Sequence, residues 1–240
     1  MSITSTLLLR LAAPMQSWGN SGGKFDHRTT GTEPTRSGII GMIAGAWGFD
    51  REDSLDIFEE LKMGVRIDQV GEIERDFHMV HRYNARTKKE ESSWVTHRYY
   101  LCDAIFLVGI EGEEKFLGRI MEVLQNPTYP IYLGRRACPP EGKLILGVRS
   151  DKGLKQALME EPWMAQEWYK KKKSPVFLEI VRDAFEKEPA TYIGRDNPFS
   201  FSQRHREYRA RKIVRDRRAV RISNIESDLE IQTTHNPLDF

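Results

Sequence analysis

Cysteine and long apolar runs are scarce in this sequence, and each shortage narrows what the chain can be. Cys102 and Cys138 are the only cysteines among 240 residues, which argues against a disulfide scaffold, so we expect two reduced thiols. No run of about eighteen apolar residues occurs, so no contact with a membrane is expected. Residues 1–6 lack the charged and apolar stretches of a signal peptide, and we therefore expect a cytoplasmic protein.

Several catalytic and cofactor signatures are absent as well. There is no G-x-x-x-x-G-K-[ST] stretch, which excludes a P-loop nucleotide-binding site. His78 and His81 lie three apart on a predicted strand and so point to opposite faces, and no cysteine cluster lies near them. We therefore predict no metal site and no cofactor.

Enough apolar material is present for a folded core, since the chain is 39% hydrophobic and 10% aromatic. Periodicity and turn residues predict strands at 6–11, 65–70, 103–110 and 143–148, helices at 35–47, 54–62 and 113–125, and a hairpin at 77–100. The order βαββαβ predicts an α+β, ferredoxin-like (RRM-like) domain, with two helices on one face of an antiparallel sheet. We assign this domain to residues 1–149. A smaller, basic lobe follows at 150–240, with helices at 154–159 and 163–169 and strands at 176–181 and 219–225.

The net charge of +2 hides a strong asymmetry. Residues 204–221 hold nine basic and two acidic side chains, a net charge of +7, and the rest of the chain carries −5. Most of the nine are arginines, whose guanidinium groups bind phosphate oxygens through two hydrogen bonds and stack on bases. This segment indicates a polyanionic partner or an acidic protein surface, and the sequence does not separate the two.

The start of the first predicted helix is a candidate anion site. Thr35 is the expected N-cap, and the free N–H groups, the helix dipole and Arg36 come together there. Four glycines share one face of this helix, namely Gly38, Gly41, Gly45 and Gly48. They allow either tight packing on the sheet or close approach of a nucleic-acid backbone or a neighbouring subunit.

Four short segments carry a resemblance to a known family. They are Met15-Gln16-Ser17-Trp18-Gly19, Pro34–Met42, Tyr100–Phe106 and Pro130–Pro139. In residues and order they resemble the CasD subunit family of the type I-E CRISPR Cascade complex, within the RAMP superfamily. The resemblance covers most of residues 5–149, and the later part of the chain is less diagnostic.

The resemblance implies a RAMP-type ferredoxin-like fold and a non-catalytic role in antiviral defence. A subunit of this family caps the 5′ handle of the CRISPR RNA within a ribonucleoprotein complex. The implied partners are the backbone CasC subunits, the large CasA subunit and, indirectly, target DNA at the start of the guide.

The resemblance also implies an RNA site made of two loops and the helix start. The residues at matching positions are Gln16, Ser17, Trp18, Arg36, Ser37, Tyr132, Gly134, Arg135 and Arg136. Lys24, His27 and Arg28 lie in the same long loop as further phosphate ligands. Trp18 and Tyr132 are the candidates for stacking on unstacked bases. Trp18 has an alternative role, as a core tryptophan that anchors the loop.

The polar hairpin at 77–100 corresponds to a protruding thumb that presses on the guide in this family. Its tip is expected at 84–93, and His81, Arg82 and Arg98 on its arms are candidate RNA contacts. Without the resemblance, it reads as an ordinary solvated hairpin.

Two other functions remain as alternatives. RAMP relatives include metal-independent endoribonucleases that process CRISPR repeat RNA by acid–base chemistry, for which His27 and His81 are the available groups. A general single-strand RNA binder of the RRM type is disfavoured, because no basic-Gly-aromatic RNP1 stretch occurs.

Overall fold

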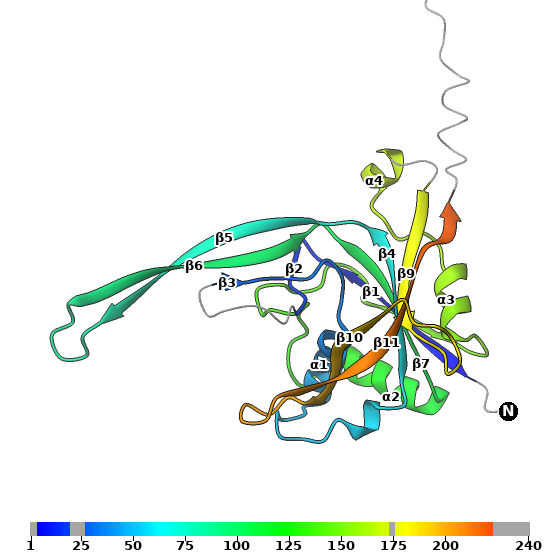
Figure 1. Cartoon of the computed structure of the whole chain (residues 1–240), viewed down its shortest axis with the longest axis horizontal. Helices are drawn as coiled ribbons and strands as arrows, with labels where there is room; N and C mark the ends of the chain where they lie inside the picture. Colours follow the sequence, from blue (N-terminus) through cyan, green and yellow to red (C-terminus); the bar gives the residue numbers. More distant parts are fainter. Residues whose placement is uncertain (1–3, 20–26, 173–175, 223–240) are drawn as a thin grey trace, which may run out of the picture.

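The computed structural model describes residues 4–19, 27–172 and 176–222 and shows a mixed α+β protein rich in sheet (Figure 1). Within these ranges no helix is both long and apolar enough to cross a membrane. The candidate ligand Lys24 and the end of the predicted strand at 219–225 lie outside the described residues. Cys102 and Cys138 are free thiols, as predicted.

Four strands and two helices form the centre of the molecule. In chain order they are β1 (Ser5–Ala12), α1 (Arg36–Trp47), β4 (Lys62–Gln69), β7 (Ile105–Gly112), α2 (Glu114–Gln125) and β8 (Ile145–Arg149). The strands are antiparallel and lie in the order β4-β7-β1-β8. These six elements confirm the corresponding six predictions, with ends that differ by a few residues.

Strand β1 is mostly apolar because both of its faces are buried, and Ser5, Thr6 and Arg10 are its polar residues. Leu7, Leu9 and Leu11 face the main core, to which α1 and α2 contribute. Leu8 points the other way and packs against Leu154 and its neighbours on α3 (Leu154–Glu160). The sheet is therefore covered by α1 and α2 on one side and by α3 on the other.

Three later strands extend the same sheet. They are β9 (Val176–Asp183), β10 (Tyr192–Ser200) and β11 (Glu207–Ile222), and the full order is β10-β11-β9-β4-β7-β1-β8. Strand β9 pairs directly with β4, where Gly64 lies opposite Arg182 and Ile67 opposite Glu179. Backbone pairing thus runs across the proposed boundary at residue 149, and the division into two domains stays a prediction.

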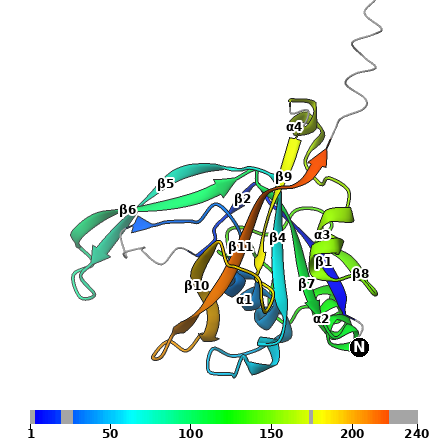
Figure 2. The same ribbon diagram turned by 45° about the vertical axis from the view of Figure 1, so that its right-hand side comes forward.

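A long two-stranded hairpin leaves the body between β4 and β7. Its strands are β5 (Glu72–Tyr83) and β6 (Glu90–Cys102), and in Figures 1 and 2 it projects far from the rest of the molecule. The hairpin is longer than the predicted 77–100 segment, with a turn of only residues 84–89. Near its root, β2 (Met15–Gln16) and β3 (His27–Arg28) pair with the other edge of β6.

Two predictions after the first helix need correction. The helix expected at 54–62 is only a short 3-10 turn, Asp56–Phe58. The reason is that β4 begins at Lys62, where it already pairs with β7. The helix expected at 163–169 becomes α4 (Glu167–Lys172), because Trp163 Nε1 instead donates a hydrogen bond to the Asp68 carbonyl oxygen at 2.7 Å.

Candidate nucleic-acid interface

The two predicted RNA-binding loops pack directly against each other. The Ser17 N–H donates to the Leu133 carbonyl oxygen at 3.0 Å. Gly134 has φ +89°, and a Cβ atom there would lie 1.6 Å from the Ser17 carbonyl oxygen. Only glycine tolerates both this backbone angle and this approach. The glycine-rich loop is thus fixed against the loop that follows β1.

Trp18 is a core residue of this assembly. Its side chain is 1% exposed, and its Nε1 donates to Gln16 Oε1 at 3.0 Å. Gln16 is also buried, and its Nε2 donates to the Ala104 carbonyl oxygen at 2.7 Å. The Trp18 ring rests on the start of α1, since a Cβ on Gly38 would lie 3.0 Å from it. The prediction that Trp18 stacks on a base is wrong, as is a direct role for Gln16, and Trp18 instead anchors the loop.

The start of α1 has the predicted cap. Thr35 Oγ1 accepts a hydrogen bond from the Gly38 N–H at 3.1 Å. Arg36 does not point outward, however. It is 5% exposed and binds Asp183 through Nη1 at 2.9 Å and Asn197 through Nε at 2.8 Å. The prediction that the Arg36 side chain holds phosphate is therefore wrong, because its donors are engaged within the fold.

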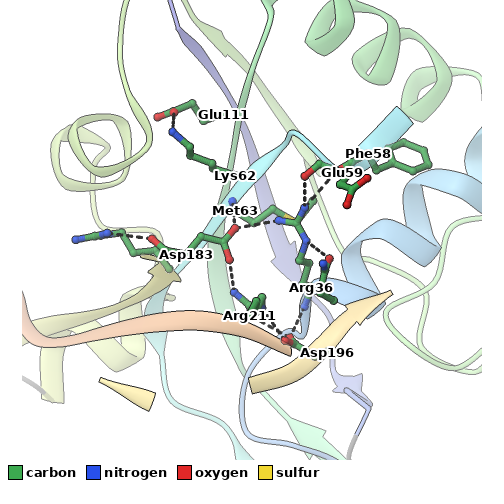
Figure 3. A network of polar contacts seen from close by, with 11 residues as sticks. Arg36, Phe58, Glu59, Lys62, Met63, Glu111, Asp183, Asp196 and Arg211 are labelled. Atoms are coloured by element: carbon green, nitrogen blue, oxygen red, sulfur yellow. Dashed lines mark hydrogen bonds and ion pairs between the residues drawn. The ribbon is translucent and has the colours of Figure 1, made fainter. Parts of the chain in front are cut away.

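Arg36 belongs to a buried network that joins α1 to the C-terminal strands (Figure 3). Arg211 on β11 bridges Asp183 at 2.7 Å and Asp196 at 2.6 Å, and Asp196 accepts the Arg36 N–H at 2.8 Å. Burial lowers the pKa of Arg36, although Asp183 opposes this. Burial alone would lower the pKa of Arg211 and raise that of Asp196. The hydrogen bonds and the attraction between their opposite charges outweigh burial, so the pKa of Arg211 is raised and the pKa of Asp196 is lowered.

Around the start of α1 lies an open depression of about 380 Å³, called the basic depression below. It brings together residues from both loops, the helix start and β11. Its lining residues are Ser17, Trp18, Gly19, Arg28, Thr29, Thr35, Ser37, Gly38, Gly134, Arg135, Arg206 and Tyr208. Six predicted site residues are thus collected here: Ser17, Trp18, Arg28, Ser37, Gly134 and Arg135.

Positive charge in the depression is not neutralised by nearby carboxylates. In the described part of the chain, Arg28, Arg135 and Arg206 have no ion-pair partner. The Arg135 guanidinium lies 4.8 Å from the Tyr100 ring centre and donates to the Arg28 carbonyl oxygen at 2.9 Å. Its Nη1 and Thr29 Oγ1 are buried atoms without a hydrogen-bond partner. Unused buried donors beside unpaired cations suit an anionic ligand.

The remaining predicted residues lie around or away from the depression. The pairing of β3 with β6 places Arg98 beside Arg28, and the His27 and His97 ring centres are 5.2 Å apart. Tyr132 and Arg136 are exposed near the depression without lining it. His81 and Arg82 lie farther out on the hairpin, where they pair with Glu90 at 3.0 Å and Glu91 at 3.3 Å.

Sequence reasoning did not single out Arg206 and Tyr208, which the start of β11 and the residue before it bring into the depression. The signal was the arginine-rich segment at 204–221, and the structure divides that segment by role. Arg211 is internal, as described above, and Arg215 pairs with Glu33 and Glu179. Arg206 is exposed. Whether an arginine of this segment is internal or exposed depends on the direction of its side chain, which composition does not reveal.

Comparison with known proteins agrees with this geometry. Residues 6–214 match the family described as CRISPR-associated protein (Cas_Cas5). The chain is 34% identical over 172 residues to the CRISPR system Cascade subunit CasD of Escherichia coli (strain K12), an alignment that covers 65% of this chain and 76% of the relative.

Two solved structures are similar over almost their whole length. A chain from a CRISPR RNA-guided surveillance complex has a TM-score of 0.71 and 31% identity, over 95% of this chain and 98% of that one. A second structure, described as a Cas protein, has a TM-score of 0.66 and 32% identity, over 90% of this chain and 97% of that one. The chain therefore belongs to the Cas5 family of CRISPR-associated proteins.

Proposed function

We propose that this chain is a non-catalytic subunit of a Cascade-type CRISPR surveillance complex and binds the 5′ handle of the CRISPR RNA. The observation that carries the proposal is the basic depression, where Arg28, Arg135 and Arg206 converge on the start of α1. Phosphate groups of a single strand suit such a site, because helix N-termini and guanidinium groups both bind them. The similarity to a surveillance-complex chain supports the setting.

The proposed fold type is RAMP-like and ferredoxin-like. The order β4-β7-β1-β8, with α1 and α2 on one face, supports this reading. We assign the β5–β6 hairpin as the thumb, supported by its projection from the body. The proposed partners are CasC subunits, the CasA subunit and, indirectly, target DNA at the guide start, and the proposed location is the cytoplasm.

A ribonuclease is the second candidate, and one observation favours it. The His27 and His97 rings lie close together beside Arg28 and Arg98, as an acid–base pair would. Incubating the purified chain with repeat RNA in EDTA decides between the two functions. We expect intact RNA. Cleavage that is lost in His27→Ala and His97→Ala would contradict the non-catalytic role.

Handle binding is tested with two RNAs that differ only in the handle, titrated alone and with the other complex subunits. We expect tighter binding of the handle-bearing RNA and a steep loss of affinity with salt, because phosphate contacts release counterions. Arg206→Gln should weaken binding and reduce the slope of log K against log salt by about 0.7.

Arg217→Gln is the matched control, since Arg217 is an exposed arginine of the same basic segment, on β11, and does not line the depression. We expect it to leave the handle preference unchanged. Equal affinity of the two RNAs under every condition would contradict the proposal.

A further inference from the structure

A second cavity adjoins the basic depression. It lies in the crevice between the start of α1 and strands β4, β9, β10 and β11, and its volume is about 420 Å³. This is within the range of about 300–1,000 Å³ typical of ligand pockets. Gly19, Thr35, Ser37 and Tyr208 line both cavities. One extended ligand can therefore occupy the depression and the crevice together.

The crevice differs from the depression in its chemistry. Met63, Val65, Val181 and Ile213 give it an apolar floor. Tyr192 and Tyr208 form aromatic sides and are 38% and 39% exposed. Such a lining suits a flat, uncharged ring and does not suit a phosphate group.

Charge is also distributed unequally between the two cavities. In the crevice, Asp196 and Arg211 neutralise each other through contacts at 2.6 and 2.9 Å, and Glu33 pairs with Arg215. Arg195 is the one guanidinium in its lining without an ion-pair partner among the described residues. In the depression, the guanidinium groups of Arg28 and Arg206 have no ion-pair partner among the described residues. A ligand that spans both cavities would thus place its anionic part in the depression and its apolar ring in the crevice.

We propose that the crevice takes one unstacked base of the bound RNA, whose phosphate lies in the basic depression. Tyr208 stands where the two cavities meet and stacks on the base. Single-stranded RNA is commonly held in this way, with bases turned out onto aromatic rings. The inference rests on the proposed handle binding and adds to it the residues that receive a base.

The test uses the full chain and a set of handle-bearing RNAs, each lacking one handle base. Base–aromatic stacking contributes about 5- to 150-fold in affinity. One abasic position should weaken binding to the unsubstituted chain by a factor in this range. Tyr208→Ala should bind this abasic RNA and the intact RNA with equal affinity, because the substitution and the missing base remove the same stacking contact. Tyr208→Leu repeats the measurement with a side chain that retains most of the apolar volume.

Tyr129→Ala is the control, because Tyr129 is 51% exposed and lines neither cavity. In this variant the abasic penalty should equal that of the unsubstituted chain. Equal penalties in the Tyr208 variants as well would overturn the base pocket while leaving handle preference intact. Normal RNA binding with impaired assembly onto the other subunits would also overturn it, since the crevice would then receive a protein. Loss of handle preference in the unsubstituted chain would instead contradict the proposed function.

Discussion

At Gly134 the chain has no room for a methyl group. The positive φ angle and the Ser17 carbonyl oxygen, 1.6 Å from an added Cβ, both require glycine. This single contact fixes the distance between the two loops that line the basic depression. The residue therefore sets the shape of the basic depression.

Gly134→Ala should lower the free energy of unfolding by about 3 kcal/mol or more, since strain and overpacking add. Denaturant unfolding followed by circular dichroism measures the change. Gly45→Ala is the opposite control, because Gly45 lies inside α1, in its last turn, and a Cβ there meets nothing within 4 Å. It should raise the free energy of unfolding by about 0.8–1 kcal/mol. Similar effects for the two substitutions would contradict this account.

The limits of sequence reasoning are clearest at single residues. The family resemblance of short segments was enough to place Ser17, Ser37 and Gly134 together, and all three line the basic depression. The burial of Arg36 could not be predicted, since its partners Asp183 and Asn197 lie about 150 residues away along the chain. A short motif does not reveal which side of a helix start later strands will cover.

Among the elements, α1 depends most on distant parts of the chain. Its first turn is held by the buried network that reaches β9, β10 and β11 through Asp183, Asp196 and Arg211 (Figure 3). A buried charge left without its partner is costly. The network therefore holds the helix start, and with it one wall of the basic depression, in place.

Asp196→Asn should destabilise the chain by about 3 kcal/mol at neutral pH, because Arg211 and the Arg36 N–H lose a charged acceptor. The pKa of Asp196 is lowered in the folded state. Its stabilisation is therefore present above the unfolded value of about 3.9 and is lost as the pH falls through the folded pKa. Urea unfolding from pH 7 to pH 3 should show a smaller acid-side loss in the variant.

Glu52→Gln is the control for this measurement, since Glu52 is exposed and has no ion-pair partner in the described ranges. It should leave both the neutral stability and its pH dependence unchanged. An Asp196→Asn variant that loses stability on acidification as steeply as the unsubstituted chain would contradict the role of this carboxylate.

Elements with strong local periodicity were predictable, and irregular ones were not. The spacing of Leu117, Ile120 and Leu124 marks α2, and the leucine-rich stretch at residues 7–11, interrupted only by Arg10, marks β1. Strand β10 contains Gly194 and Pro198 and shifts register twice against β11, so it has no clear alternation. Most of β11 was not predicted either. Many of its residues are charged, and the sequence does not show which partners on other strands they face.

At the scale of the whole molecule, residues on both sides of position 149 share one sheet and one hydrophobic cluster. Strand β4 pairs with β9, and Leu8 and Leu107 are covered by α3. A chain that lacked residues 150–240 would leave the edge of β4 unpaired, and Arg36 would lose the carboxylates of Asp183 and Asp196.

A chain ending at residue 149 should therefore fail to show cooperative thermal unfolding. The matched control ends at Ile222, so that every described element is kept, and it should unfold in one transition. Calorimetry and the dispersion of amide NMR signals measure the difference. A cooperative transition in the shorter chain would instead support the two-domain division predicted from sequence.

The hairpin root has a mechanical consequence. Gly71, between β4 and β5, approaches the Cys102 carbonyl oxygen so closely that an added Cβ would lie 2.5 Å from it. Strands β5 and β6 thus leave the body as a clamped pair, from two neighbouring strands near the middle of the sheet. The hairpin is therefore an arm that is anchored at one end, and its outer half keeps a fixed position relative to the basic depression. An RNA bound at both places, as proposed, would therefore span a fixed distance between the basic depression and the outer half of the hairpin.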